Sequence, residues 1–231
     1  MEPEIEDLSK FLNRMGAKIQ GAGTNIIKIC GVKQLKPVSY KIMSDRIEAG
    51  TYLCAIAATG GKACICNAES EHIIPVIRKL EDAGCKFNIQ NKKIEIQAPK
   101  RLKAVDIKTL PYPGFPTDMQ SVFGAILASA KGTSIIVENI FENRFKYMSE
   151  LKKMGAKITT EEKTGIIKGV KKLTGTTVKS TDLRGGAALV IAALSSKGKS
   201  RVQDIEYILR GYEKLDEKLQ RLGAKIYIEK S

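Results

Sequence analysis

The chain repeats itself, and this internal repeat constrains the fold more than any other feature of the sequence. Four similar segments each end an amphipathic helix at a glycine, and these glycines recur about every 70 residues: Gly16, Gly84, Gly155 and Gly223. Glycine suits a helix end because it adopts the left-handed conformation without steric cost. An alternating strand is predicted after each glycine, for example over residues 225–228.

A second repeated unit lies between these segments. It begins with a hydroxyl residue followed by aspartate, and continues into small apolar helices predicted over 52–58, 121–130 and 186–194. Helices that are apolar nearly all round have to be buried on all sides. We therefore predict an α/β domain with approximate threefold internal symmetry, in which three buried helices pack together inside sheets and amphipathic helices.

Residues 1–43 do not contain a complete repeat. They hold a helix up to Met15 and two predicted strands, near 18–19 and 25–30, with no buried helix of their own. We expect residues 1–43 to be the tail of the last repeat of a preceding domain, and 44–231 to be a second domain of three repeats. The sequence is interpreted as truncated at its N-terminus, so a missing N-terminal domain is an expected partner.

The net charge of +14 favours an anionic partner. Aromatic residues make up only 6% of the chain, tryptophan is absent and the lysines are scattered, so binding of nucleic acid is not favoured. An anionic small molecule fits this composition better. No apolar run is long enough to span a bilayer, and the acidic start does not resemble a signal peptide. We interpret the chain as cytoplasmic, without a membrane partner.

The cysteines give no sign of a metal site or a disulfide framework. Their number is odd, and the chain has a single histidine, His72, so a zinc site is not expected. Cys64 and Cys66 share one face of a predicted strand. All five are interpreted as structural: Cys30, Cys54, Cys64, Cys66 and Cys85. No metal and no cofactor are predicted.

Four strings occur in an order that resembles one enzyme family. They are Pro-Tyr-Pro-Gly-Phe-Pro-Thr-Asp-Met-Gln at 111–120, Phe-Glu-Asn-Arg-Phe at 141–145, Asp-Leu-Arg at 182–184 and Arg-Gly-Tyr-Glu at 210–213. Along nearly all of its length the chain resembles the enolpyruvyl transferases, and among them the UDP-N-acetylglucosamine 1-carboxyvinyltransferases. The resemblance implies an inside-out α/β barrel with pseudo-threefold symmetry around buried helices, and an active site between two such domains.

The resemblance also implies a reaction. The enolpyruvyl group of phosphoenolpyruvate would pass to the 3′-hydroxyl of UDP-N-acetylglucosamine, the first committed step of peptidoglycan precursor synthesis. Such chemistry needs fixed cations and a base. The family's catalytic-cysteine loop and N-terminal lysine have no counterpart here, so we expect the chain to be inactive alone. Alternatives are a 3-phosphoshikimate 1-carboxyvinyltransferase fragment, a non-catalytic binding or scaffold half, and a basic nucleic-acid-binding repeat protein.

Asp118 and Arg210 are the predicted catalytic residues. By resemblance, Asp118 is the base that contacts the sugar hydroxyl, whereas spacing alone favours a capping box of Thr117 and Gln120 around it. Arg210 is expected just before a helix that begins near residue 211, where an arginine suits an anion. By resemblance it binds phosphoenolpyruvate; otherwise it would pair with a surface carboxylate, Glu213 or Asp204.

The remaining candidate residues are assigned to substrate binding by resemblance. Asp182 would lie near the substrate phosphate, although capping of its helix is an equal alternative, and Arg184 would support it. The backbone of Ile140 would contact the nucleotide sugar, and Arg144 would line the cleft. Three charged residues at the start of the first buried helix are expected to hold the two domains together: Asp45, Arg46 and Glu48.

Overall fold

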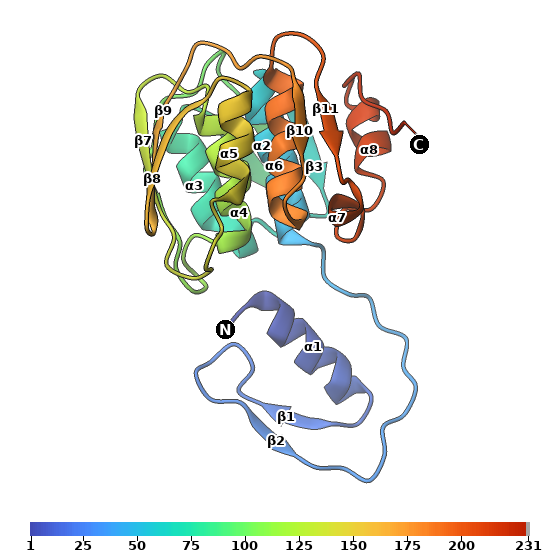
Figure 1. Ribbon diagram of the computed structural model, residues 1–231. Helices are drawn as coiled ribbons and strands as arrows, with labels where there is room; N and C mark the ends of the chain where they lie inside the picture. The colour runs from blue at the N-terminus through green and yellow to red at the C-terminus, as the bar shows by residue number, and fades with distance from the viewer. Residues whose placement is uncertain (230–231) are drawn as a thin grey trace.

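A computed structural model describes residues 1–229 and divides them between a small N-terminal part and a larger α/β domain (Figure 1). The N-terminal part consists of helix α1 (Pro3–Arg14) and the antiparallel pair β1 (Lys18–Gln20) and β2 (Lys28–Cys30). An irregular segment then leads to the larger domain. None of the helices in this described part is long and apolar enough to cross a lipid bilayer.

Three helices form the centre of the larger domain: α2 (Arg46–Thr59), α4 (Thr117–Leu127) and α6 (Leu183–Ser195). Each contacts the other two, and nearly all of their residues are buried. Figure 1 shows them side by side, with sheets and further helices around them. The predicted packing of three apolar helices around one centre is confirmed, because helices without a polar face find enough apolar surface only on one another.

Each central helix is associated with a sheet, but the three sheets differ in completeness. The second is full, with strand order β6 (Ile107–Lys108), β7 (Thr133–Val137), β9 (Thr164–Lys168) and β8 (Lys157–Glu161). The first has order β3 (Lys62–Cys66), β5 (Lys93–Gln97) and β4 (Lys86–Gln90). The third contains only the parallel pair β10 (Thr177–Lys179) and β11 (Arg201–Gln203).

Amphipathic helices complete the repeats on the outside. They are α3 (Ile74–Asp82), preceded by the 3₁₀ helix Ser70–Ile73, then α5 (Lys146–Lys153), the single-turn α7 (Glu206–Leu209) and α8 (Leu215–Arg221). The glycines that follow α1, α3, α5 and α8 have φ between 88° and 104°. The prediction that glycine ends these helices in the left-handed conformation is therefore confirmed.

The strand predicted over residues 225–228 does not form. Its counterparts β4 and β8 each pair with the strand that follows them in a hairpin. No such following strand is present among the described residues after α8. The prediction is wrong here because a strand needs a hydrogen-bonding neighbour, which an alternating pattern does not supply.

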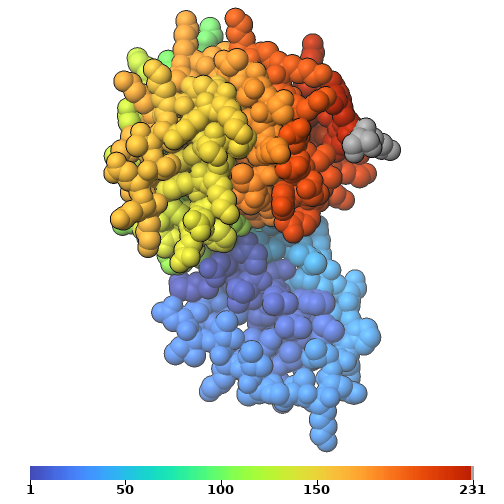
Figure 2. Space-filling model, viewed as in Figure 1, coloured from blue at the N-terminus to red at the C-terminus, as the bar shows by residue number. Residues whose placement is uncertain are grey.

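Side-chain contacts attach the N-terminal part to the larger domain. Figure 2 shows residues 1–43 as a separate lobe beneath it. Arg46, at the start of α2, donates to Glu4 of α1 at 2.8 Å, so it joins the two parts as expected. Asp45 instead caps α2 by accepting from the amides of residues 47 and 48, and Glu48 pairs with Lys218 of the same domain.

Two buried tyrosines provide a stability test of the core. The hydroxyl of Tyr212 lies 2.9 Å from Thr51 Oγ1. The hydroxyl of Tyr147 has no hydrogen-bond partner among the described residues, and burial raises its pKa. An unpaired buried polar group costs about 1–3 kcal/mol. We expect Tyr147→Phe to raise the free energy of unfolding by about 1 kcal/mol, and Tyr212→Phe to lower it by about as much.

Urea denaturation of the two variants beside the unaltered chain measures this difference. Because both substitutions remove one hydroxyl from a core tyrosine, each is the control for the other. Equal losses of stability in the two variants would show that the Tyr147 hydroxyl is satisfied, and would contradict the interpretation.

Candidate functional site

Asp118 lies between two arginines that come from different repeats. Arg144 Nη2 donates to Asp118 Oδ1 at 2.8 Å, and Arg184 Nη2 donates to Asp118 Oδ2 at 3.1 Å. The arginine side chains are only 8% and 14% exposed, whereas that of Asp118 is 38% exposed. The structure thus brings together three of the predicted site residues, and the carboxylate is the one that remains open to solvent.

Neighbouring aromatic rings hold both guanidinium groups. The guanidinium of Arg144 lies 4.2 Å from the ring centre of Phe141, and that of Arg184 lies 5.5 Å from the ring centre of Tyr212. Stacking on a ring stabilises a cation and restricts its orientation. The arginines are therefore fixed in place before any ligand arrives.

The predicted capping box at the start of α4 is wrong. The helix begins at Thr117 after Pro116, and no side chain caps it. Thr117 donates instead to Glu138, and the side-chain amide of Gln120 has no hydrogen-bond partner among the described residues. The Asp118 carboxylate is occupied by its arginines. Spacing along the chain suggested a local partner, but the guanidinium groups of Arg144, from the loop after β7, and of Arg184, from the next repeat, are stronger partners because they are charged.

Asp182 does cap its helix. Its Oδ1 accepts from the amides of Arg184 and Gly185 at 3.0 and 2.8 Å, and its Oδ2 accepts from the hydroxyl of Thr181. The capping alternative is therefore confirmed. By fixing the first turn of α6, Asp182 sets the position from which Arg184 reaches Asp118.

Glu138 is a buried residue of the site that the sequence analysis missed. It is 4% exposed and follows β7 directly. Oε1 accepts from the hydroxyl of Thr109 at 2.7 Å and from the amides of Ile140 and Phe141 at 2.9 and 3.0 Å. Oε2 accepts from the hydroxyl of Thr117 at 3.0 Å. This single carboxylate ties the end of β6, the start of α4 and the loop that carries Arg144.

Ile140 lies in that loop and is 45% exposed. Its amide is directed to Glu138, so it is the carbonyl that is left for a ligand. The sequence held one signal for Glu138: an acidic residue directly after a predicted buried strand and close to the Phe-Glu-Asn-Arg-Phe string. Glutamate is rarely buried, so this signal alone predicts a solvent-exposed residue.

Arg210 is not where the sequence placed it. It follows the last residue of the four-residue helix α7, and the next helix, α8, starts only at Leu215. The expected helix near residue 211 fails because Lys214 has φ 48°, which a continuous helix does not allow. Arg210 is exposed, lies 5.4 Å from the ring centre of Tyr207, and makes no ion pair within residues 1–229. Neither alternative carboxylate, Glu213 or Asp204, pairs with it.

The charges of the cluster define what it can do. Burial lowers the pKa of Arg184, but Tyr212 and Asp118 more than offset this effect, so that its pKa is raised and it stays a cation. Each oxygen of Asp118 accepts one guanidinium bond and retains acceptor capacity. An exposed, oriented carboxylate of this kind can accept the hydrogen of a ligand hydroxyl. Within residues 1–229, no three potential metal-ligating side chains come together.

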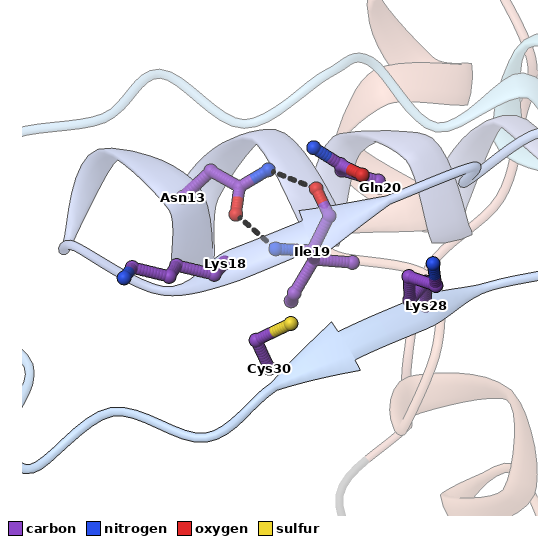
Figure 3. Close-up of a pocket in the computed structure, with 6 residues that line it drawn as sticks. All are labelled: Asn13, Lys18, Ile19, Gln20, Lys28 and Cys30. Atoms are coloured by element: carbon purple, nitrogen blue, oxygen red, sulfur yellow. Dashed lines mark hydrogen bonds between the residues drawn. The ribbon is translucent and has the colours of Figure 1, made fainter.

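Two hollows on the surface lie away from this cluster. The smaller, of about 320 Å³, is lined by the β1–β2 pair and α1; in Figure 3 the Asn13 side chain bridges the amide and carbonyl of Ile19, opposite Cys30. The larger, of about 1130 Å³, lies between β11, the segment after α8, and helices α2 and α6. It follows the edge of the incomplete third sheet.

Comparison with known proteins gives a consistent result. The family model described as EPSP synthase (3-phosphoshikimate 1-carboxyvinyltransferase) matches residues 1–219. A UDP-N-acetylglucosamine 1-carboxyvinyltransferase of Caldanaerobacter subterraneus is 54% identical over 98% of this chain, and that of Thermotoga maritima is 49% identical over all of it. The chain spans only 54% and 55% of the lengths of these relatives.

Solved structures agree with the fold. The enolpyruvyl transferase NikO from Streptomyces tendae superposes with a TM-score of 0.87 at 26% identity, covering 98% of this chain and 54% of its own. EPSP synthase from Acinetobacter baumannii superposes with a TM-score of 0.73 at 19% identity, over 96% of this chain and 55% of its own. At that identity the second match shows the fold alone.

Proposed function

Because the chain belongs to the enolpyruvyl transferase family, we propose that it supplies one side of an active site that transfers enolpyruvyl from phosphoenolpyruvate to the 3′-hydroxyl of UDP-N-acetylglucosamine. The observation that carries the proposal is the open carboxylate of Asp118 between two nearly buried guanidinium groups. A transfer of this kind requires a base for the hydroxyl and fixed cations for the anionic substrates.

Asp118 takes the role of the base. As the 3′-hydroxyl oxygen attacks the central carbon of phosphoenolpyruvate, its proton passes to the carboxylate, and the methylene carbon takes up a proton to give a tetrahedral adduct with a methyl group. Phosphate leaves when this adduct collapses: the methyl carbon loses a proton and the carbon–carbon double bond forms again. Arg144 and Arg184 hold both carboxylate oxygens, so the base is oriented without reorganisation at the moment of reaction.

The surrounding residues bind the substrates in this proposal. Arg210 is exposed and free of a carboxylate partner within the described chain, so its guanidinium is available to the phosphate or carboxylate of phosphoenolpyruvate. The Ile140 carbonyl would contact the sugar. Asp182, occupied as a helix cap, acts through the position of Arg184.

The proposed domain organisation assigns residues 44–231 to the second of two domains arranged as inside-out α/β barrels, and 1–43 to the end of the first. Three exposed isoleucines of the N-terminal part support this assignment. Ile26, Ile29 and Ile42 are 77%, 69% and 74% exposed. Exposed apolar patches mark surfaces that other protein covers. The unpaired edge of β11, together with the larger hollow beside it, would accept a further strand of the same protein.

The similarity ranks the alternatives. Relatives named for UDP-N-acetylglucosamine are 49–54% identical to the chain, whereas the EPSP synthase structure is 19% identical. This difference favours UDP-N-acetylglucosamine over 3-phosphoshikimate as the acceptor. A purely binding half could use the same carboxylate to hold a ligand hydroxyl, so a measurement of turnover separates it from a catalytic one.

A chimeric enzyme tests the proposal. The part of the Caldanaerobacter subterraneus relative that matches this chain would be replaced by the 231 residues. We expect the chimera to release phosphate from phosphoenolpyruvate only when UDP-N-acetylglucosamine is present. The chain alone should release none, because positioning by the rest of the active site supplies much of the rate.

The controls separate folding from function. The parent enzyme gives the reference rate, and shikimate 3-phosphate replaces the acceptor in a parallel assay. A chimera that folds, by circular dichroism and gel filtration, but releases no phosphate with either acceptor would refute the catalytic proposal. Release with shikimate 3-phosphate alone would instead assign the alternative acceptor.

A further inference from the structure

The two cysteines of β3 form a site that the proposed function does not use. Cys54 and Cys85 are buried in the core, but Cys30, Cys64 and Cys66 are exposed. The three exposed cysteines lie outside the buried core, so for them the expectation of a structural role stays a prediction. The Sγ atoms of Cys64 and Cys66 lie 3.9 Å apart, within reach of a weak hydrogen bond.

The strand itself explains this proximity. Residues two apart on a strand point to the same face, and β3 alternates between exposed and half-buried residues along its length. Only one edge of β3 is paired, with β5, so the strand lies at the border of its sheet. Both thiols are accessible from solvent, and no segment of residues 1–229 covers them.

We propose that Cys64 and Cys66 form a reversible dithiol–disulfide site that reacts with low-molecular-weight disulfides. A thiolate of one cysteine attacks the small disulfide, forms a mixed disulfide and releases one small thiol. The second thiolate attacks the protein sulfur of that mixed disulfide and releases the second small thiol. Two electrons and two protons pass from the protein dithiol to the oxidant, which is converted into two thiols.

The geometry of the strand sets the stability of the disulfide. At about 3.3 Å per residue, the two Cα atoms of an extended strand lie about 6.6 Å apart. Disulfides span about 4.4–6.8 Å between Cα atoms but only about 3.8 Å between Cβ atoms, whereas the parallel Cβ vectors of one strand face lie about as far apart as the Cα atoms. The bridge therefore requires β3 to bend at Ile65, and the disulfide stores strain. Strained disulfides are the easily reduced ones, so the site should return to the dithiol with a mild reductant.

The charges around the pair are mixed. Cys66 lies opposite Lys93 and Cys64 opposite Glu95 on β5. Desolvation by neighbouring side chains, the hydrogen bond with Cys66 and the charge of Glu95 raise the pKa of Cys64, and Lys93 offsets part of this rise. Since the thiolate is the reactive form, oxidation should be faster at mildly alkaline pH than at neutral pH.

Oxidation with glutathione disulfide, followed by alkylation and peptide mass spectrometry, tests the site on the 231-residue chain. We expect the peptide with both cysteines to lose two hydrogens and to resist alkylation until dithiothreitol is added. Cys30 is the internal control: it is exposed but has no partner thiol, so it should carry glutathione. In Cys64→Ser and Cys66→Ser, the remaining thiol should also carry glutathione.

Any other product would overturn the proposal. Glutathione retained on Cys64 or Cys66 in the unaltered chain would show that the second thiol cannot reach the first. Free, alkylatable thiols at both positions would show that the pair does not react. A disulfide between two chains would show that Cys64 or Cys66 reacts with a cysteine of a second copy and not with its neighbour on the same strand.

Discussion

Asp118→Asn is expected to abolish most of the turnover of the chimeric enzyme, by about 10²–10⁴-fold. The amide has nearly the shape of the carboxylate but cannot accept the substrate proton as a base. The substitution should also lower the free energy of unfolding of the 231-residue chain by about 1–3 kcal/mol. The reason is that Arg144 and Arg184, which are 8% and 14% exposed, would both lose their anionic partner.

Asp182→Asn is the matched control, because Asp182 also lies at the start of a central helix but serves as its N-cap. Asparagine caps a helix about as well as aspartate, so the free energy of unfolding of the Asp182→Asn chain should hardly change. Phosphate release and urea denaturation of both variants give the two readouts. A turnover within a few-fold of the parent chimera in Asp118→Asn would rule out the base. An unchanged stability would show that the paired arginines contribute nothing to the fold.

Glu138→Ala is expected to cause the largest loss of stability, about 3–5 kcal/mol. The substitution removes the acceptor of four donors: the hydroxyls of Thr109 and Thr117 and the amides of Ile140 and Phe141. Of these, only the Thr109 hydroxyl keeps another acceptor among the described residues, the Val137 carbonyl at 3.5 Å. These groups join three elements around the site. The loop that carries Arg144 should therefore loosen, although Glu138 does not contact Arg144 directly.

Glu142→Ala is the control for Glu138→Ala, since Glu142 is exposed in the same loop. Its effect should stay within about 0.5 kcal/mol. Glu138→Gln keeps the shape and one acceptor oxygen, so its loss should be intermediate. Thermal melting and urea denaturation of the three variants measure the order of their stability losses. If Glu138→Ala were no worse than Glu142→Ala, the hydrogen bonds to Glu138 would not stabilise the loop.

The repeat and its apolar helices were enough to predict the centre of the fold. Period and burial are properties that a sequence displays directly, so the three packed helices followed from them. Pairing of strands was harder to predict. Residues 225–228 alternate as a strand should, but an alternating pattern does not say whether a neighbouring strand is available.

The site shows the same limit at the level of single residues. Spacing alone favoured a local cap for Asp118, and only the resemblance grouped it with Arg144 and Arg184. Glu138 was missed because its burial arises from loops that meet in space, and nothing nearby in the sequence shows this. Arg210 was misplaced because a positive φ at Lys214 delays the next helix.

The three mutually buried helices also determine how such a chain can change. In a solenoid, a unit contacts only its neighbours, so units can be gained or lost one at a time. Here α2, α4 and α6 each contact both of the others. Loss of one repeat would expose apolar surface on the two that remain, and a fourth would find no place at the centre. The repeats are alike in sequence, yet the number three is fixed by geometry. The domain can therefore be inherited or recombined only as a complete unit of three repeats.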